Sequence, residues 1–163
     1  MRTKFLRARL FLFLILLLLT ISLTACSYST DFVVFNDTAY AIEVIYRVKP
    51  SPIGPPSLSI EPMVVSAANL ETSGIGKWTK LPPNRFRIDQ ANRTVIVRVA
   101  AQEGLWITSM PHYIGDEDPN DVKDFPIQEV WVRGADGEIR FTGDKARKAF
   151  ERKSRVLYVL SYK

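Results

Sequence analysis

The side chains best suited to bind a metal ion lie in one acidic segment, residues 112–126, with the sequence HYIGDEDPNDVKDFP. Asp116, Asp118 and Asn120 alternate there, as oxygen ligands do at positions one, three and five of a calcium-binding loop. Two later positions do not fit, because Asp121 stands where glycine is needed and Ile127 where a bidentate acid belongs. The segment predicts a solvated acidic loop, with a calcium-dependent surface module as an alternative.

Catalytic chemistry has little support in the residue types. His112 is the only histidine and Cys26 the only cysteine, so a zinc site would need carboxylates for nearly every ligand. The sequence contains no G-x-S-x-G elbow for a serine nucleophile. Gly74, Gly76 and Lys77 fall far short of a phosphate-binding loop. We therefore expect a protein that is not an enzyme and that needs no cofactor.

Cys26 lies at the end of an export signal. The chain begins with the basic segment MRTKFLRAR and continues in an unbroken apolar run from Leu10 to Leu19. The small residues Thr24 and Ala25 come directly before the cysteine. A basic start, a short apolar centre and small residues before a cleavage point are the parts of a secretory signal. The sixteen residues 10–25 are fewer than the roughly 20 that a membrane-spanning helix needs.

The quartet Leu23-Thr24-Ala25-Cys26 resembles the lipobox of bacterial lipoproteins, in which an aliphatic residue, a small or polar residue, and glycine or alanine precede an obligatory cysteine. The resemblance covers residues 1–27 only. It implies that signal peptidase II cleaves before Cys26 and that this residue carries a diacylglycerol on sulfur and an acyl chain on nitrogen. Ser27, in place of aspartate, implies the periplasmic face of an outer membrane rather than the inner membrane, if the source has two membranes.

The charge of the mature chain is nearly balanced. Four of the 22 Lys and Arg residues and none of the 17 Asp and Glu residues lie in residues 1–25, which leaves a net charge of +1 for the rest. We therefore expect no nucleic-acid partner. Basic residues still gather near the C-terminus, where they predict a solvated helix face or a patch that touches anionic headgroups or an acidic partner: Lys145, Arg147, Lys148, Arg152 and Lys153.

Most of the mature chain alternates apolar and polar residues with a period of two. The segments AIEVIYRV (41–48), RTVIVRVA (93–100) and VLYVLSY (156–162) are the clearest predicted strands. Asp136-Gly137 is typical of a two-residue hairpin turn. Trp78, Trp106 and Trp131 lie in strand-like segments, so we expect them in the core. Weaker strand candidates are 32–35, 58–65, 77–81, 85–88, 105–110, 129–133 and 138–141.

One stretch, 144–153, has helical spacing, with Asp144 as a possible cap and Phe150 facing the sheet. The pattern predicts a mainly β fold, an antiparallel β-sandwich of immunoglobulin-like layout with this one short helix. The domains are a signal peptide (1–25), a short lipidated tether (26–30) that would reach roughly 15 Å, and a single β-rich domain (31–163).

These features predict a membrane-anchored bacterial lipoprotein that acts as a non-catalytic binding or scaffolding component of the cell envelope. Its partners would be the membrane, through the lipids on Cys26, and an unidentified envelope protein. A tethered periplasmic enzyme or ligand carrier is the alternative from another class.

Overall fold

The computed structural model describes residues 27–50, 61–70, 78–113, 125–154 and 156–163. Cys26 and the calcium candidates Asp116, Asp118 and Asn120 lie outside these residues, as does the signal segment 1–25. The regular structure of the described part is mainly β, with two short α-helices and one short 3-10 helix.

Eleven strands form two sheets in the described part of the chain. The six-stranded sheet has the order β10-β11-β1-β7-β3-β4, with bounds Glu151–Ser154, Leu157–Tyr162, Ser27–Asn36, Glu103–Tyr113, Met63–Ser66 and Thr79–Lys80. The five-stranded sheet has the order β5-β6-β2-β8-β9, with bounds Phe86–Asp89, Thr94–Val99, Ile42–Val48, Ile127–Gly134 and Gly137–Thr142. The strand pairs are antiparallel except β1 and β11, which run parallel.

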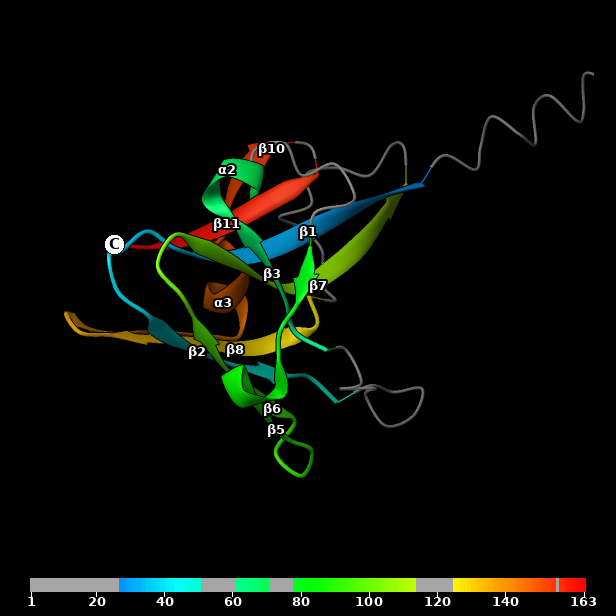
Figure 1. The fold of residues 1–163 in the computed structure, drawn as a ribbon. Coiled ribbons are helices and arrows are strands. Elements are labelled where there is room, and N and C mark those ends of the chain that lie inside the picture. Colours follow the sequence, from blue (N-terminus) through cyan, green and yellow to red (C-terminus); the bar gives the residue numbers. More distant parts are fainter. Residues whose placement is uncertain (1–26, 51–60, 71–77, 114–124, 155) are drawn as a thin grey trace, which may run out of the picture.

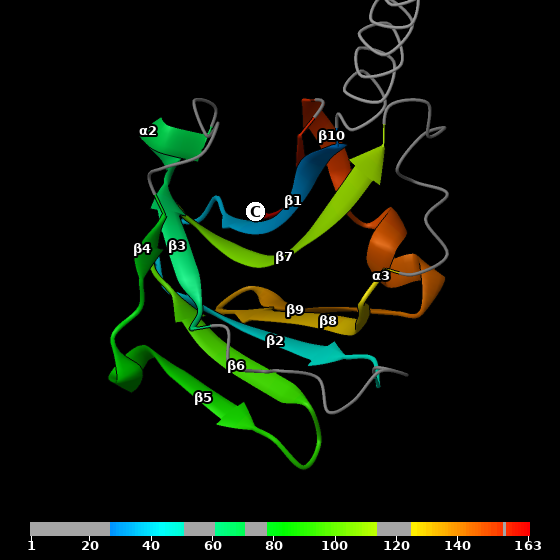
Figure 2. The same ribbon diagram turned by 90° about the vertical axis from the view of Figure 1, so that its right-hand side faces the viewer.

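The two sheets lie as layers on either side of one main core (Figure 1, Figure 2). Strand β2 shows how the sequence sets this arrangement, because Ile42, Val44 and Tyr46 are buried while the alternate residues Glu43 and Ile45 are not fully buried. Successive side chains of a strand point to opposite faces, so the period of two gives each sheet an apolar inner face.

Four aromatic rings fill one end of the core. Phe32 of β1 lies with its ring centroid 4.8 Å from that of Phe125, 5.6 Å from that of Phe150 and 5.2 Å from that of Tyr158. Phe150 follows helix α3 (Asp144–Lys148), which contacts β8 and β9. In Figure 2 this helix lies at one side of the space between the layers. The aromatic cluster therefore holds α3 and β10 against the six-stranded sheet.

An ion pair joins the two sheets at another place. Arg85, at the end of the 3-10 helix η1 (Pro83–Arg85), places its Nη2 atom 2.5 Å from the Oε2 atom of Glu103 in β7. The backbone amide of Ala100 also donates a hydrogen bond to Glu103, at 2.9 Å. Burial acts to raise the pKa of Glu103, but the hydrogen bonds from Arg85 and Ala100 outweigh it and hold that pKa below its ordinary value of 4.5.

This lowered pKa predicts a loss of stability in acid. The carboxylate of Glu103 binds a proton less readily in the folded state than in the unfolded chain. The stability that the ionised Glu103 contributes is therefore present above pH 4.5 and is lost as the pH falls through the folded-state pKa. Below about pH 4.5 the wild-type protein should lose no more than about 1 kcal/mol of unfolding free energy that the E103Q variant does not lose. The melting temperature of E103Q should therefore fall less steeply in acid than that of the wild type. Substitution E61Q is the matched control, because Glu61 pairs with Lys80 and both side chains are largely exposed. Equal acid profiles for wild type and E103Q would contradict the assignment.

The structure differs from the sequence expectations at both ends of the domain. Strand β1 begins at Ser27, so the residues expected as a tether pair instead with the end of β7, from Ser27 opposite Tyr113 to Thr30 opposite Met110. The helix expected over 144–153 ends at Lys148, and Glu151–Ser154 forms strand β10. Pairing with β11 accounts for the strand at Glu151–Ser154. A short exposed segment is stabilised more by hydrogen bonds to an existing sheet edge than by one further helical turn.

A second helix, α2 (Ala67–Leu70), and the parallel pairing of β1 with β11 were also not expected. The tryptophans are only partly buried. Trp106 donates a hydrogen bond from Nε1 to Oδ1 of Asp31 at 3.1 Å, and Trp78 packs against a small apolar cluster outside the main core. The expectation that all three tryptophans belong to the core was therefore wrong. Trp106 of β7 and Trp131 of β8 alternate with buried neighbours, and Trp78 lies just before β4 rather than in a strand.

Candidate functional site

The predicted basic patch is distributed over helix α3 and strand β10. The side chains of Lys145, Lys148, Arg152 and Lys153 are exposed and that of Arg147 is partly buried. Lys153 places its Nζ atom 3.1 Å from Oε2 of Glu151. The five residues therefore do not form one cluster on a long helix, and Lys153 lines a separate surface feature.

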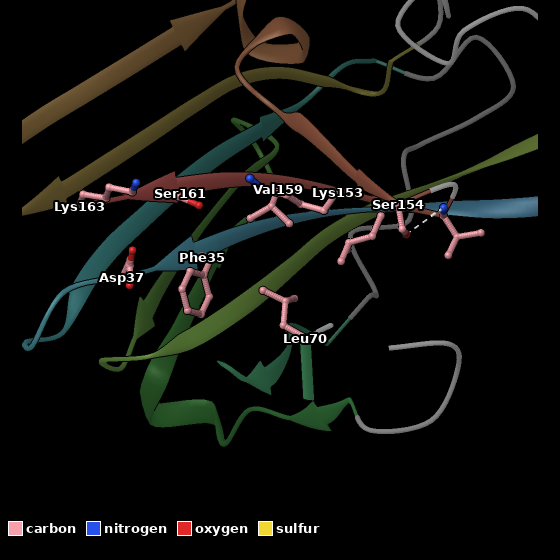
Figure 3. A pocket seen from close by; sticks show the side chains of 10 residues that line it. Phe35, Asp37, Leu70, Lys153, Ser154, Val159, Ser161 and Lys163 are labelled. Carbon is pink, nitrogen blue, oxygen red and sulfur yellow. Dashed lines mark hydrogen bonds between the residues drawn. The ribbon is translucent and has the colours of Figure 1, made fainter. Parts of the chain in front are cut away.

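That feature is a groove of about 590 Å³ on the outer side of the six-stranded sheet. Figure 3 shows one row of side chains, Lys153, Val159, Ser161 and Lys163, opposite a second row formed by Leu70, Phe35 and Asp37. The two rows come from β10 and β11 on one side and from β1 and α2 on the other. Ser154, Val156 and Leu157 complete the lining.

The apolar part of the groove belongs to a second cluster, distinct from the main core. Its buried members are Val33, Val65, Leu70, Leu157 and Val159, and Phe35 packs against them. Gly104 of β7 allows this packing, because an added Cβ atom would lie 2.9 Å from Cγ1 of Val33, 3.2 Å from Cγ1 of Val65 and 3.5 Å from Cδ1 of Leu70. A side chain at position 104 would displace Leu70 or its neighbours, so the glycine sets how closely α2 approaches the sheet.

Charge is uneven along the groove. Lys153 and Ser154 lie at the end near the start of β11, and Lys163 lies near Asp37 at the other end. Asp37 is the one carboxylate side chain among the lining residues, whereas Glu151 approaches from outside through its contact with Lys153. The Lys153 end is therefore the one at which a bound anion would meet a cation and a hydroxyl without a lining carboxylate.

The outer face of the five-stranded sheet carries a second group of polar side chains. Arg133 lies over the ring of Trp131, with its Cζ atom 3.6 Å from the ring centroid, and the Cζ atom of Arg140 lies 5.0 Å from it. Glu129, which is 7% exposed, accepts a hydrogen bond from Arg140 and lies 3.7 Å from Arg47. These charges are largely satisfied by one another, so we assign the network to the stability of the sheet and choose the groove as the candidate site.

Sequence reasoning identified Lys153 of the groove and missed the rest. The signal was present in VLYVLSY, because Leu157 and Val159 are apolar on the face opposite Tyr158 and Leu160. A strand that is apolar on both faces is covered on both faces. The positions of α2 and β10 over that second face depend on tertiary packing, so no local sequence pattern predicts them.

The remaining chemical candidates can be placed only in part. Within the described segments, no group of three or more His, Cys, Asp or Glu side chains is close enough to hold a metal ion. The same part of the chain contains no helix that is both long and apolar enough to cross a membrane.

Comparisons with protein-family models, with curated proteins and with solved structures found no match.

Proposed function

We propose that this chain is a bacterial lipoprotein precursor whose mature part is a β-sandwich domain of immunoglobulin-like layout, held at a membrane by lipids on Cys26. Its function is non-catalytic: it serves as a binding or scaffolding component of the cell envelope, on the periplasmic face of an outer membrane. The observation that carries the proposal is the quartet Leu23-Thr24-Ala25-Cys26 directly after a basic and then apolar segment.

The start of β1 gives the anchor a structural consequence. Because β1 begins at Ser27, the ordered domain would follow the lipidated residue at once. A lipid on Cys26 would then hold the first residues of β1, which pair with the end of β7, beside the headgroups without a spacer. Such a domain works next to the bilayer or on a partner embedded in it.

The basic residues of α3 and β10 support a contact with an acidic partner or with anionic headgroups near the membrane. Ser154 of β10 lies opposite Leu157 of β11, which in turn lies opposite Asp31 of β1. Asp31 is four residues after Ser27, about 13 Å along a strand. The basic side chains of β10, Arg152 and Lys153, therefore lie two strands away from the part of β1 that follows the proposed anchor.

Photo-crosslinking in intact cells tests the scaffold role. A benzophenone amino acid at Lys148, an exposed member of the basic patch, should capture one or a few envelope proteins reproducibly. The same probe at Asp136 is the control, because this exposed residue lies in the β8–β9 turn, at the end of β9 opposite to α3. Equal capture from both positions, or none from Lys148, would contradict the proposal and favour a tethered ligand carrier.

A further inference from the structure

We propose that the groove on the outer side of the six-stranded sheet binds a long-chain fatty acid, with its carboxylate at Lys153 and its hydrocarbon chain along β11. The site is independent of the lipid on Cys26 and of the proposed scaffold role. It assigns a ligand class to a surface that is built from Phe35, Leu70, Leu157 and Val159.

The dimensions of the groove suit one acyl chain. Its volume of about 590 Å³ lies within the range of small-molecule sites. The lining follows β11 from Leu157 to Lys163, which is about 20 Å at the rise of a β-strand. An extended palmitoyl chain has about this length.

The chemistry of the lining favours a hydrocarbon over a peptide. The middle of the groove is formed by Phe35, Leu70 and Val159, with Ser161 as a small polar neighbour. A peptide backbone laid over these side chains would lose its hydrogen bonds to water and find few partners. A hydrocarbon chain has no such groups, and its burial is favourable for each methylene that leaves water.

The ends of the groove orient the ligand. At one end, the Lys153 ammonium and the Ser154 hydroxyl can both donate hydrogen bonds to a carboxylate. Ser154 Oγ already accepts a hydrogen bond from the backbone amide of Val156 at 3.3 Å, so its own proton is available for donation. At the other end the cation Lys163 lies near the carboxylate of Asp37, which offsets its attraction for an anion, whereas no carboxylate lines the Lys153 end. The Glu151 contact of Lys153 is exposed and can be exchanged for the ligand.

Photolabelling of the full lipidated protein in phosphatidylcholine nanodiscs tests this site. A diazirine-bearing palmitate should label the peptides that contain residues 67–70 and 157–163. Excess palmitate should compete, whereas hexadecanol, which has the same chain without the charge, should compete about fivefold less well. Substitution S161W, which fills the groove from a partly buried position, should reduce labelling about tenfold or more.

Charge reversal supplies the matched pair. Substitution K153E should reduce labelling about fivefold, whereas R87E, at an exposed arginine of β5 outside the groove, should leave it unchanged. Unchanged melting temperatures of the variants establish that they fold. Labelling that spreads over membrane-facing peptides, that resists S161W, or that is replaced by crosslinks to a peptide or a second copy of the chain would overturn the proposal. Loss of the scaffold partner or of the Cys26 lipid would leave the groove labelling in place, so the two proposals fail separately.

Discussion

Substitution C26A is expected to abolish incorporation of labelled fatty acid completely and to leave the precursor uncleaved. The thiol is the acceptor of the diacylglycerol in the lipoprotein family that the quartet Leu23-Thr24-Ala25-Cys26 resembles. Cys26 is the only cysteine of the chain, so no other side chain can replace it as a thiol acceptor. Metabolic labelling with palmitate, followed by gel electrophoresis, gives both readouts.

A relocated thiol is the sharpest control for this prediction. The double variant C26A/S29C restores a cysteine three residues later, at an exposed position of β1, outside the lipobox. It should remain unlabelled. Label on C26A/S29C would show that any thiol near the signal is modified, and label on C26A would show that Cys26 is not the acceptor.

The same lipids explain why the protein should remain with the membrane. A single acyl chain gives only reversible membrane binding, whereas two or more chains add about 0.8 kcal/mol for each buried methylene group and make the anchor stable. Once the signal has been removed, the lipids on Cys26 would be the firm attachment of a chain whose remaining net charge is only +1. High salt should therefore fail to extract the mature protein, and detergent should release it.

Substitution N36A is expected to destabilise the folded domain by about 3 kcal/mol, or roughly 10 °C in melting temperature. Asn36 ends β1 and is 0% exposed. Its Nδ2 atom donates hydrogen bonds to the carbonyl oxygens of Tyr40, Val99 and Ala100, at 2.8, 3.3 and 2.9 Å. Its Oδ1 atom accepts hydrogen bonds from the amide and the hydroxyl of Thr38, at 3.1 and 2.7 Å.

These contacts tie the chain where it passes from one sheet to the other. Tyr40 precedes β2, Val99 ends β6 and Ala100 follows it, so the Asn36 amide joins three segments from both layers. Alanine would leave several backbone groups in a buried place without partners, and the loss of each costs free energy. Thermal or denaturant unfolding of the purified protein measures the effect.

Substitution N92A is the matched control for N36A. Asn92 is exposed, and its side-chain amide donates a hydrogen bond to Oδ2 of Asp89 at 2.8 Å. We expect a change within about 0.5 kcal/mol for its replacement. Similar destabilisation by N36A and N92A would contradict the role assigned to the buried amide.

The elements with the strongest alternation were predictable from the sequence, and their physical basis is plain. Segments 41–48, 93–100 and 156–162 form β2, β6 and β11, because alternate apolar residues give each strand one face for the core. A two-residue turn also joins β8 and β9 at the expected place, but it is formed by Ala135 and Asp136, since Gly137, at φ +132°, is the first residue of β9 and pairs with Gly134. The mainly β class follows from these segments alone.

The pairing of distant strands could not be predicted in the same way. β1 and β11 are separated by most of the chain, yet they run side by side in parallel, and no local residue pattern specifies that contact. The same limit explains residues 151–154, where pairing with β11 wins over a weak helical spacing. It also explains the candidate site, since the groove exists only where β10, β11, β1 and α2 meet.

The central claim, that the mature protein begins at a lipidated Cys26, is tested most directly by the mass of its N-terminal peptide. The protein is extracted from membranes with detergent, digested and measured by mass spectrometry. The account predicts a peptide that starts at Cys26 and carries a diacylglyceryl group together with an N-linked acyl chain. A peptide that starts at another residue, or one that contains Cys26 with a free thiol, would contradict it.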